Sequence, residues 1–121
     1  MGIMNKILLI EDDQSINKIL AYELSKKGYQ VDSLFEGKEA VQTILENDYD
    51  LVLVDWMLPY QDGVSIIKEV RSNDYVKPLI LLTARSEQED IIKGLEAGAD
   101  DYLTKPFQSA VLIARIEAHL R

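Results

Sequence analysis

The chain has 121 residues, 47% of them hydrophobic, and carries a net charge of −8 at pH 7. This length is typical of one domain and allows a buried core. The acidic charge argues against nucleic-acid binding by this chain alone, because phosphate backbones require a basic surface. The absence of cysteine excludes disulfides and thiolate chemistry, and a single histidine excludes a His-rich metal site.

The first half of the chain predicts three strands and two helices. A short apolar run at residues 7–10 predicts a buried strand, and the helix that follows it is expected to end before Gly28. A weaker strand over residues 31–35 precedes the second helix, and the third strand covers residues 51–54 and ends at Asp55. The expected inward positions of these two helices are Ile16, Ile19, Leu20 and Leu24, and Ala40, Val41, Ile44 and Leu45.

The second half continues the alternation. A turn over residues 57–63 leads into the third helix, and the fourth strand covers residues 79–82. The fourth helix is expected from about residue 87 to 97, the fifth strand over residues 101–104, and the fifth helix from about 108 to 120. These helices are expected to bury Val64, Ile67 and Val70, then Ile92 and Leu95, and finally Leu112, Ile113, Ile116 and Leu120.

Five strand and helix pairs in strict alternation indicate an α/β protein. Strands that are apolar throughout are buried on both faces, which is typical of a parallel sheet covered by helices. Because such crossovers are right-handed, the order predicts a doubly wound, flavodoxin-like (βα)5 three-layer sandwich. We expect one domain over residues 1–121, with its parallel strands in the order 2-1-3-4-5.

Polar residues follow four of the strands: Glu11 and Asp12, then Asp55, Thr83 and Lys105. The carboxyl ends of parallel strands meet at one edge of the sheet, so these side chains should lie together. Carboxylates about 4 Å apart repel each other by roughly 4 kcal/mol at an effective dielectric constant of 20, and a divalent cation relieves that repulsion. Oxygen ligands without imidazole or thiolate select Mg²⁺. With the charge screened, a carboxylate can attack phosphorus, the lysine can hold phosphoryl oxygens, and the threonine can donate a hydrogen bond.

Each of these residues also has an ordinary structural interpretation. Acidic residues before a helix cap it and complement its dipole. Asp55 can begin a loop, Thr83 and Tyr102 can fill strand positions, and Lys105 can be a solvated lysine. Chance would then have to place all of them at the strand ends of one sheet, which makes phosphoryl chemistry the favoured interpretation.

Two other classes of protein with related features fit less well. A flavin-binding electron carrier needs a phosphate cradle rich in Ser, Thr and Gly after the first strand, where this chain has acidic residues. An aspartyl phosphatase needs a second acid two residues after its nucleophile, where this chain has Met57.

Several segments match known motifs in both order and spacing, over nearly the whole chain. The matching segments are Ile10-Glu11-Asp12-Asp13, Val54-Asp55-Trp56-Met57-Leu58-Pro59, Asp62-Gly63, Leu82-Thr83-Ala84 and the run from Gly98 to Phe107. The chain resembles the receiver domain of two-component response regulators. The Gly98 to Phe107 run most resembles the winged-helix (OmpR/PhoB-like) transcription-factor subfamily.

The resemblance implies that Asp55 is the phosphoacceptor and takes a phosphoryl group from a phosphohistidine on a sensor histidine kinase. It implies that Asp12, Asp55 and the backbone carbonyl of Met57 bind Mg²⁺, with Glu11 acting through a water molecule. Lys105 would contact the phosphoryl group. Such a domain is not a classical enzyme, since it catalyses only its own phosphorylation and dephosphorylation.

The resemblance also implies a switch. The Thr83 hydroxyl would move to the phosphoryl group and Tyr102 would swing inward into the vacated space, while the peptide bond between Lys105 and Pro106 would be cis. The change would alter the face formed by the fourth helix, fifth strand and fifth helix, where a homodimer would form on activation. Arg85 and Met57 lie where this family tunes self-dephosphorylation.

The predicted dimer face contains two aliphatic residues, Ile91 and Val111, that the core stripes of their helices leave unexplained. Asp100 or Asp101 remains available for an ion pair with Arg115. Our hypothesis is a dimer face that is more apolar and less salt-sensitive than is usual for the family. The alternative is two isolated surface aliphatics, which are common in soluble proteins.

The expected output is regulation of transcription, with DNA bound only through a C-terminal domain that this sequence lacks. The alternative is a stand-alone receiver that acts by protein–protein contact. The sequence shows no signal peptide and no apolar stretch of membrane-spanning length, so we expect a cytoplasmic protein without membrane contact. Met4 is an alternative natural start, which would make residues 1–3 vector-derived.

Overall fold

The structure of the protein is a computed structural model that describes residues 4–121. Residues 1–3, for which we expected a vector origin, lie outside the described residues. Strands and helices alternate along the chain as predicted. The elements are β1 Lys6–Ile10, α1 Gln14–Lys26, β2 Gln30–Leu34, α2 Ala40–Glu46, β3 Leu51–Asp55, α3 Gly63–Ser72, β4 Leu79–Thr83, α4 Gln88–Ala97, β5 Asp101–Thr104 and α5 Ser109–Leu120.

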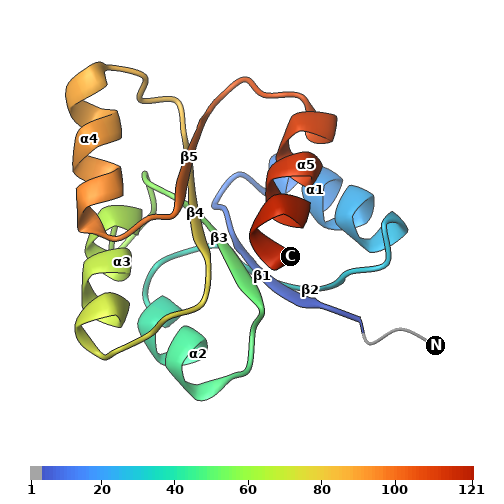
Figure 1. Cartoon of the computed structure of the whole chain (residues 1–121), viewed down its shortest axis with the longest axis horizontal. Coiled ribbons are helices and arrows are strands. Elements are labelled where there is room, and N and C mark those ends of the chain that lie inside the picture. The colour runs from blue at the N-terminus through green and yellow to red at the C-terminus, as the bar shows by residue number, and fades with distance from the viewer. Residues whose placement is uncertain (1–3) are drawn as a thin grey trace.

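The five strands form one parallel sheet in the order β2-β1-β3-β4-β5. Helices α1 and α5 cover one face of the sheet, and α2, α3 and α4 cover the other (Figure 1). This arrangement confirms the predicted flavodoxin-like (βα)5 sandwich and its strand order. The register places Asp55 of β3 beside Leu82 of β4, and Thr83 of β4 beside Thr104 of β5, so the carboxyl ends of the central strands lie at the same level.

Alternate residues of the central strands point to opposite faces of the sheet and form two cores. Every residue of β3 and β4 is buried, which explains why their sequences are apolar without alternation. The core under α2, α3 and α4 contains the strand residues Leu8, Ile10, Val52, Val54, Leu79 and Leu81. The core under α1 and α5 contains Ile7, Leu9, Leu51, Leu53, Ile80 and Leu82.

The ends of two helices show the local signals that fix them. The Asp13 side chain accepts a hydrogen bond from the Ile16 N–H (3.0 Å) and caps α1, so the third acid of the acidic run has a structural role. Gly28 after α1 and Gly98 after α4 have φ angles of 94° and 125°, a left-handed conformation that strains other residues. The two glycines therefore allow the chain to turn directly after α1 and α4.

The inward faces of three helices differ in part from the prediction. The side chains of Ile19 on α1, Leu45 on α2 and Ile92 and Leu95 on α4 are exposed. Helix α4 instead buries its two smallest residues, Gly94 and Ala97. A Cβ added at Gly94 would lie 2.8 Å from side-chain atoms of Leu81 and Tyr102, so a larger residue would require these side chains or the helix to move. Because the small residues face inward, Ile92 and Leu95 face outward, while Ile91, expected on the outer face, is partly buried.

No helix within residues 4–121 has the length and apolar character needed to cross a lipid bilayer.

Candidate functional site

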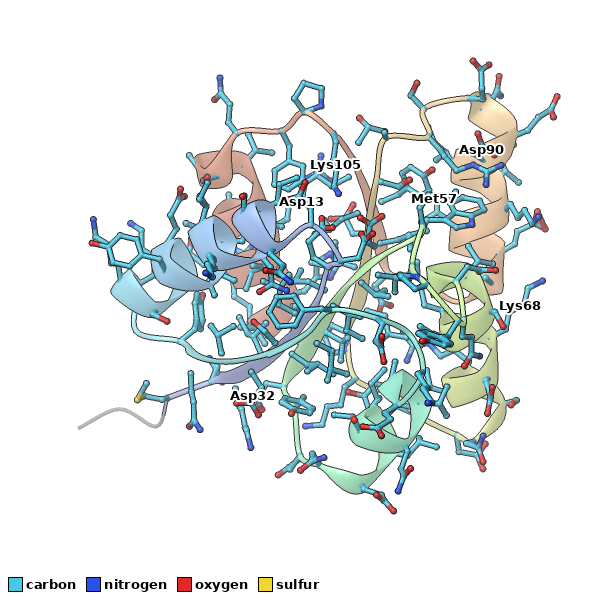
Figure 2. The ribbon with its side chains drawn as sticks, turned by 180° about the vertical axis from the view of Figure 1, so that it is seen from behind. Asp13, Asp32, Met57, Lys68, Asp90 and Lys105 are labelled. Atoms are coloured by element: carbon cyan, nitrogen blue, oxygen red, sulfur yellow. The ribbon has the colours of Figure 1, made fainter. Side chains whose placement is uncertain are left out.

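Four of the five polar residues predicted at the strand ends, Glu11, Asp12, Asp55 and Lys105, form one cluster. Glu11 and Asp12 follow β1 and Asp55 ends β3, and one carboxylate oxygen from each of the three lies within 4.8 Å of the others. Lys105, which follows β5, places Nζ 2.7 Å from Asp55 Oδ2 and also donates to Glu11 Oε1. Figure 2 shows Lys105 and Met57 at the same end of the molecule, on the loops after β5 and β3. Three strands therefore supply one acidic site with one lysine.

Two of the three carboxylates are buried and each is fixed by hydrogen bonds. Glu11 is 1% exposed and Asp55 is 4% exposed, so both charges need partners within the protein. The second oxygen of Glu11 accepts from the Asp13 N–H (3.1 Å), and Asp55 Oδ1 accepts from the Met57 N–H (3.2 Å). Together with Lys105, these backbone donors set the orientation of both carboxylates.

The electrostatics of the site favour an added cation. Burial tends to lower the pKa of Lys105, but its hydrogen bonds and charge attraction to Asp55 and Glu11 outweigh burial and raise that pKa, so the ammonium stays charged. The pKa of Asp12 is raised, first by partial loss of water and then by its hydrogen bond and charge repulsion with Glu11. Ionisation of Asp12 therefore lowers the stability of the folded protein.

The residues fit a divalent metal ion. The donors are carboxylate oxygens without imidazole or thiolate, which is the set that Mg²⁺ prefers. One ammonium faces three carboxylates, so the cluster carries an excess of two negative charges, which matches the charge of the ion. Asp12 also lines a cavity of about 440 Å³ with Met57 and Trp56, which gives the site an opening to solvent.

Thr83 and Tyr102 both bind the backbone of Arg85. The buried Thr83 hydroxyl accepts from the Arg85 N–H (3.2 Å), and the Tyr102 hydroxyl donates to the Arg85 carbonyl (2.6 Å). The Tyr102 ring lies edge-on to the Trp56 ring, with centroids 6.4 Å apart. Burial, followed by the nearby charge of Asp90, raises the pKa of the Tyr102 phenol. The two residues predicted to form a switch are thus joined through one loop.

The family model for the response regulator receiver domain matches residues 7–117. The chain belongs to the receiver domain family of response regulators. The acidic cluster, the lysine and the threonine at the strand ends therefore lie within a receiver domain. The matched range starts in β1 and ends in α5, so it contains all of these residues.

Solved structures of other receivers have the same fold. The chain is similar to the receiver domain of the Francisella response regulator 1452, with 39% identity, a TM-score of 0.93 and coverage of 96% of each chain. It is similar to the BeF3-activated N-terminal receiver domain of Klebsiella pneumoniae RstA, with 38% identity, a TM-score of 0.91 and coverage of 97% of this chain and 99% of that one. It is also similar to the Vibrio cholerae chemotaxis protein CheY4, with 28% identity, a TM-score of 0.89 and coverage of 98% and 100%.

The charged residues of the predicted dimer face have partners within the receiver domain itself. Asp101 pairs with Arg115 (3.2 Å) and contacts His119 (3.1 Å). Asp100 binds Arg71 (2.8 Å) and accepts from a backbone N–H of β4, so it is already committed inside the chain. Ile91 is partly buried and Val111 is 41% exposed.

The structure has the cis peptide bond between Lys105 and Pro106 that the resemblance implies. Two contacts of Arg85 were not predicted. Asp90 forms an ion pair with Arg85 (3.1 Å) that sequence analysis missed, because an acid in the first turn of a helix is already explained by the helix dipole. The position of Arg85 over Trp56, with 4.2 Å between the guanidinium carbon and the ring centroid, also had no sequence signal.

Mg²⁺ is expected to stabilise the folded domain through Asp12. Since the pKa of Asp12 is higher in the folded than in the unfolded chain, its ionisation costs stability at neutral pH, and that cost disappears as the pH falls below its ordinary value of 3.8. Asp12→Asn should therefore raise the melting temperature without Mg²⁺ and remove most of the response to it. At a free Mg²⁺ concentration about one hundred times the dissociation constant, binding should stabilise the unmodified protein by about 2.7 kcal/mol.

Thermal unfolding with and without Mg²⁺ measures this effect, and Asp13→Asn is the matched control. Asparagine caps helices as well as aspartate does, so this variant removes a neighbouring charge while keeping the cap of α1. It should retain the Mg²⁺ response. An equal response in Asp12→Asn and Asp13→Asn would show that Asp12 does not contribute to the ion site.

Proposed function

We propose that this receiver domain accepts a phosphoryl group on Asp55 from the phosphohistidine of a sensor histidine kinase and works as a signalling switch. The observation that carries the proposal is the environment of Asp55. Its carboxylate ends a buried strand, binds Lys105 at 2.7 Å, and lies in a cluster with the carboxylates of Glu11 and Asp12. The proposed nucleophile, Asp55, therefore contacts a cationic partner and belongs to a candidate ion site.

In the proposed step, a carboxylate oxygen of Asp55 forms a bond to phosphorus while the bond between phosphorus and the imidazole nitrogen breaks. The imidazole leaves with the electron pair and takes up a proton from solvent. Lys105, whose raised pKa keeps it charged, neutralises the incoming phosphoryl oxygens after exchanging a carboxylate partner for them.

The ion would be held by Asp12, Asp55 and the backbone carbonyl of Met57, with Glu11 acting through water. Bound Mg²⁺ supplies charge neutralisation, which lets two anions approach each other. The buried Glu11 would also hold Lys105, from whose ammonium it already accepts a hydrogen bond. We infer that the domain catalyses only its own phosphorylation and dephosphorylation.

The switch would use the two hydroxyl groups that contact Arg85. A phosphoryl group carries roughly two negative charges and adds acceptor oxygens, so it competes for the Thr83 hydroxyl. When Thr83 turns toward it, the loop that also binds the Tyr102 hydroxyl must adjust. The readout would be the face formed by α4, β5 and α5.

We infer that this face forms a homodimer on activation. Its exposed aliphatic side chains are more numerous than the sequence predicted, since Ile92, Leu95 and Val111 are 47%, 44% and 41% exposed. The acids Asp100 and Asp101 already have partners within the chain, which leaves apolar contact as the main contribution and supports a dimer of low salt sensitivity.

Leu95→Asp is expected to weaken the beryllofluoride-activated dimer at least about tenfold, because it places a charge in an apolar interface. Sedimentation at two salt concentrations measures the dimer affinity. Ile19→Asp, which changes an exposed aliphatic residue on α1, on the opposite face of the sheet from α4, is the control and should leave the affinity unchanged. Equal affinities for Leu95→Asp and the unmodified protein would place the dimer contact elsewhere.

The similarities support a proposal for the wider biological role. Likeness to the N-terminal receiver of RstA supports one receiver domain over residues 1–121 of an OmpR/PhoB-like transcription regulator, with DNA bound through a separate domain. Likeness to the chemotaxis protein CheY4 supports the alternative, a stand-alone receiver that acts by protein–protein contact. In both cases we propose a cytoplasmic location with no membrane contact.

Trp56 provides the test of the proposed function. It is the only tryptophan, it is 4% exposed, and it follows Asp55 directly. Titration with Mg²⁺ and then with beryllofluoride, a phosphoryl mimic, should change Trp56 fluorescence, and Asp55→Ala should abolish the response to beryllofluoride. An unchanged signal in the folded, unmodified protein would contradict the proposed site.

A further inference from the structure

Arg85 connects the proposed phosphoacceptor site to helix α4. Its N–H and carbonyl bind the hydroxyls of Thr83 and Tyr102. Its guanidinium stacks on the ring of Trp56, the neighbour of the phosphoacceptor, at 4.2 Å, and pairs with Asp90 in the first turn of α4 at 3.1 Å. One residue therefore contacts both parts of the proposed switch, the site and the helix.

Arg85 also borders a cavity next to the proposed phosphoacceptor site. Arg85 lines the cavity of about 440 Å³ together with Asp12 and Met57. Figure 2 shows Met57 and Asp90 on neighbouring elements at this end of the molecule, the loop after β3 and helix α4. Within residues 4–121, the structure gives Arg85 one ion-pair partner, and that partner lies on α4.

We propose that Asp90 is a positioning residue that holds Arg85 on the side of α4, and that a phosphoryl group on Asp55 takes Arg85 from Asp90. This inference rests on the proposed function of Asp55. Asp90 offers one negative charge, whereas a phosphoryl group offers roughly two and matches the paired donors of a guanidinium. The Trp56 ring supports the guanidinium in its present position and borders the same cavity, so a short rotation exchanges one anion for the other.

The C-terminal end of α4 is held independently of this exchange. Arg71 of α3 donates to the Gly98 carbonyl (3.0 Å) and pairs with Asp100 (2.8 Å), and its other guanidinium nitrogen binds the carbonyls of Tyr75 and Lys77. These bonds join the loop after α4 to the loop after α3. They lie at the opposite end of α4 from Arg85, so they should not respond to the phosphoryl group.

The N-terminal end of α4 has fewer attachments. The residue before the helix, Glu87, makes no capping hydrogen bond with its side chain, and the buried residues of the helix, Gly94 and Ala97, lie in its second half. The ion pair between Asp90 and Arg85 is therefore a main contact between the first turn of α4 and the rest of the domain. Its loss should loosen the first turn while the C-terminal end stays fixed.

Amide hydrogen exchange of a peptide covering residues 87–92 tests whether Arg85 leaves Asp90 when the site is occupied. Mg²⁺ with beryllofluoride should speed exchange in this segment of the unmodified protein about twofold to fivefold, which corresponds to the loss of one partly exposed ion pair. Asp90→Asn should show the faster exchange without beryllofluoride, and adding it should cause no further increase. Asp90→Glu, which keeps a carboxylate, should restore the slow exchange.

Glu89→Gln is the matched control, because it removes the same charge from the same helix turn at an exposed residue. It should exchange as the unmodified protein does. Slow exchange in Asp90→Asn, or a full further response to beryllofluoride, would overturn the proposal. Trp56 fluorescence in the same samples reports whether beryllofluoride binds. Binding without faster amide exchange would overturn only the transfer of Arg85 from Asp90. No binding would overturn the proposed function of Asp55 as well.

Affinity gives an independent measurement. If Asp90 competes with beryllofluoride for Arg85, Asp90→Asn should bind beryllofluoride about twofold to fivefold more tightly, because the coupling is reciprocal. In an Arg85→Met background, Asp90→Asn should have no effect. Unchanged or weaker affinity in the Asp90→Asn variant would contradict the competition.

Discussion

Asp55→Asn is expected to reduce phosphoryl uptake by at least about a thousandfold, because the variant lacks the attacking carboxylate. The fold should persist, since asparagine has the same shape and can still accept from the Met57 N–H, and Lys105 keeps Glu11 as an anionic partner. Phosphoryl incorporation from a small-molecule donor in the presence of Mg²⁺, followed by intact mass, measures the rate.

Asp48→Asn is the control for the change of charge. Asp48 is an exposed residue that precedes β3, at the opposite end of that strand from Asp55. Its variant should take up phosphoryl groups at the unmodified rate. Uptake by Asp55→Asn at a rate close to that of Asp48→Asn would mean that another residue is the acceptor.

Gly63→Ala is expected to lower the free energy of unfolding by about 3 kcal/mol, through overpacking against backbone atoms. An added Cβ would lie 2.2 Å from the carbonyl oxygen of Asp55 and 3.0 Å from the Cα of Trp56. The Gly63 N–H also donates to the Trp56 carbonyl (2.8 Å), which holds the start of α3 close to the end of β3. Because Asp55 belongs to that contact, the variant should also bind Mg²⁺ more weakly.

Denaturant unfolding of Gly63→Ala beside Gly28→Ala separates close packing from backbone strain. A Cβ at Gly28 would meet no atom within 4 Å, but the φ of 94° disfavours alanine, which should cost about 1 kcal/mol. Equal losses of stability in the two variants would show that the tight contact between the β3 end and the α3 start is not a constraint on the fold.

Sequence patterns were sufficient to predict the sheet and the acidic cluster at the carboxyl edge of its strands. Strands β3 and β4 are apolar at every position before the final residue, which is possible only for strands buried on both faces. Since the carboxyl ends of parallel strands lie at one edge, Asp55 could be placed with Glu11 before any contact was known. The contact between Lys105 and Glu11 joins residues that are 94 apart in the chain, and the strand order accounts for it.

Helix α4 shows where prediction from hydrophobicity fails. Its inward side is formed by Gly94 and Ala97, whose small side chains carry little hydrophobic signal, while Ile92 and Leu95 point to solvent. The close approach to Leu81 and Tyr102 decides this orientation, and such contacts depend on backbone positions that a sequence pattern does not contain. For the same reason, the ion pair of Asp90 with Arg85 over Trp56 could not be predicted.

The most direct test of the account is to find which residue carries the phosphoryl group. The unmodified protein, incubated with a small-molecule phosphodonor and Mg²⁺, can be reduced with borohydride, which converts an acyl phosphate to a stable alcohol, and then mapped by peptide mass spectrometry. We predict one modified residue per chain, at Asp55, and none when Mg²⁺ is removed by a chelator. Modification at another residue, or equal modification without Mg²⁺, would contradict the central claim.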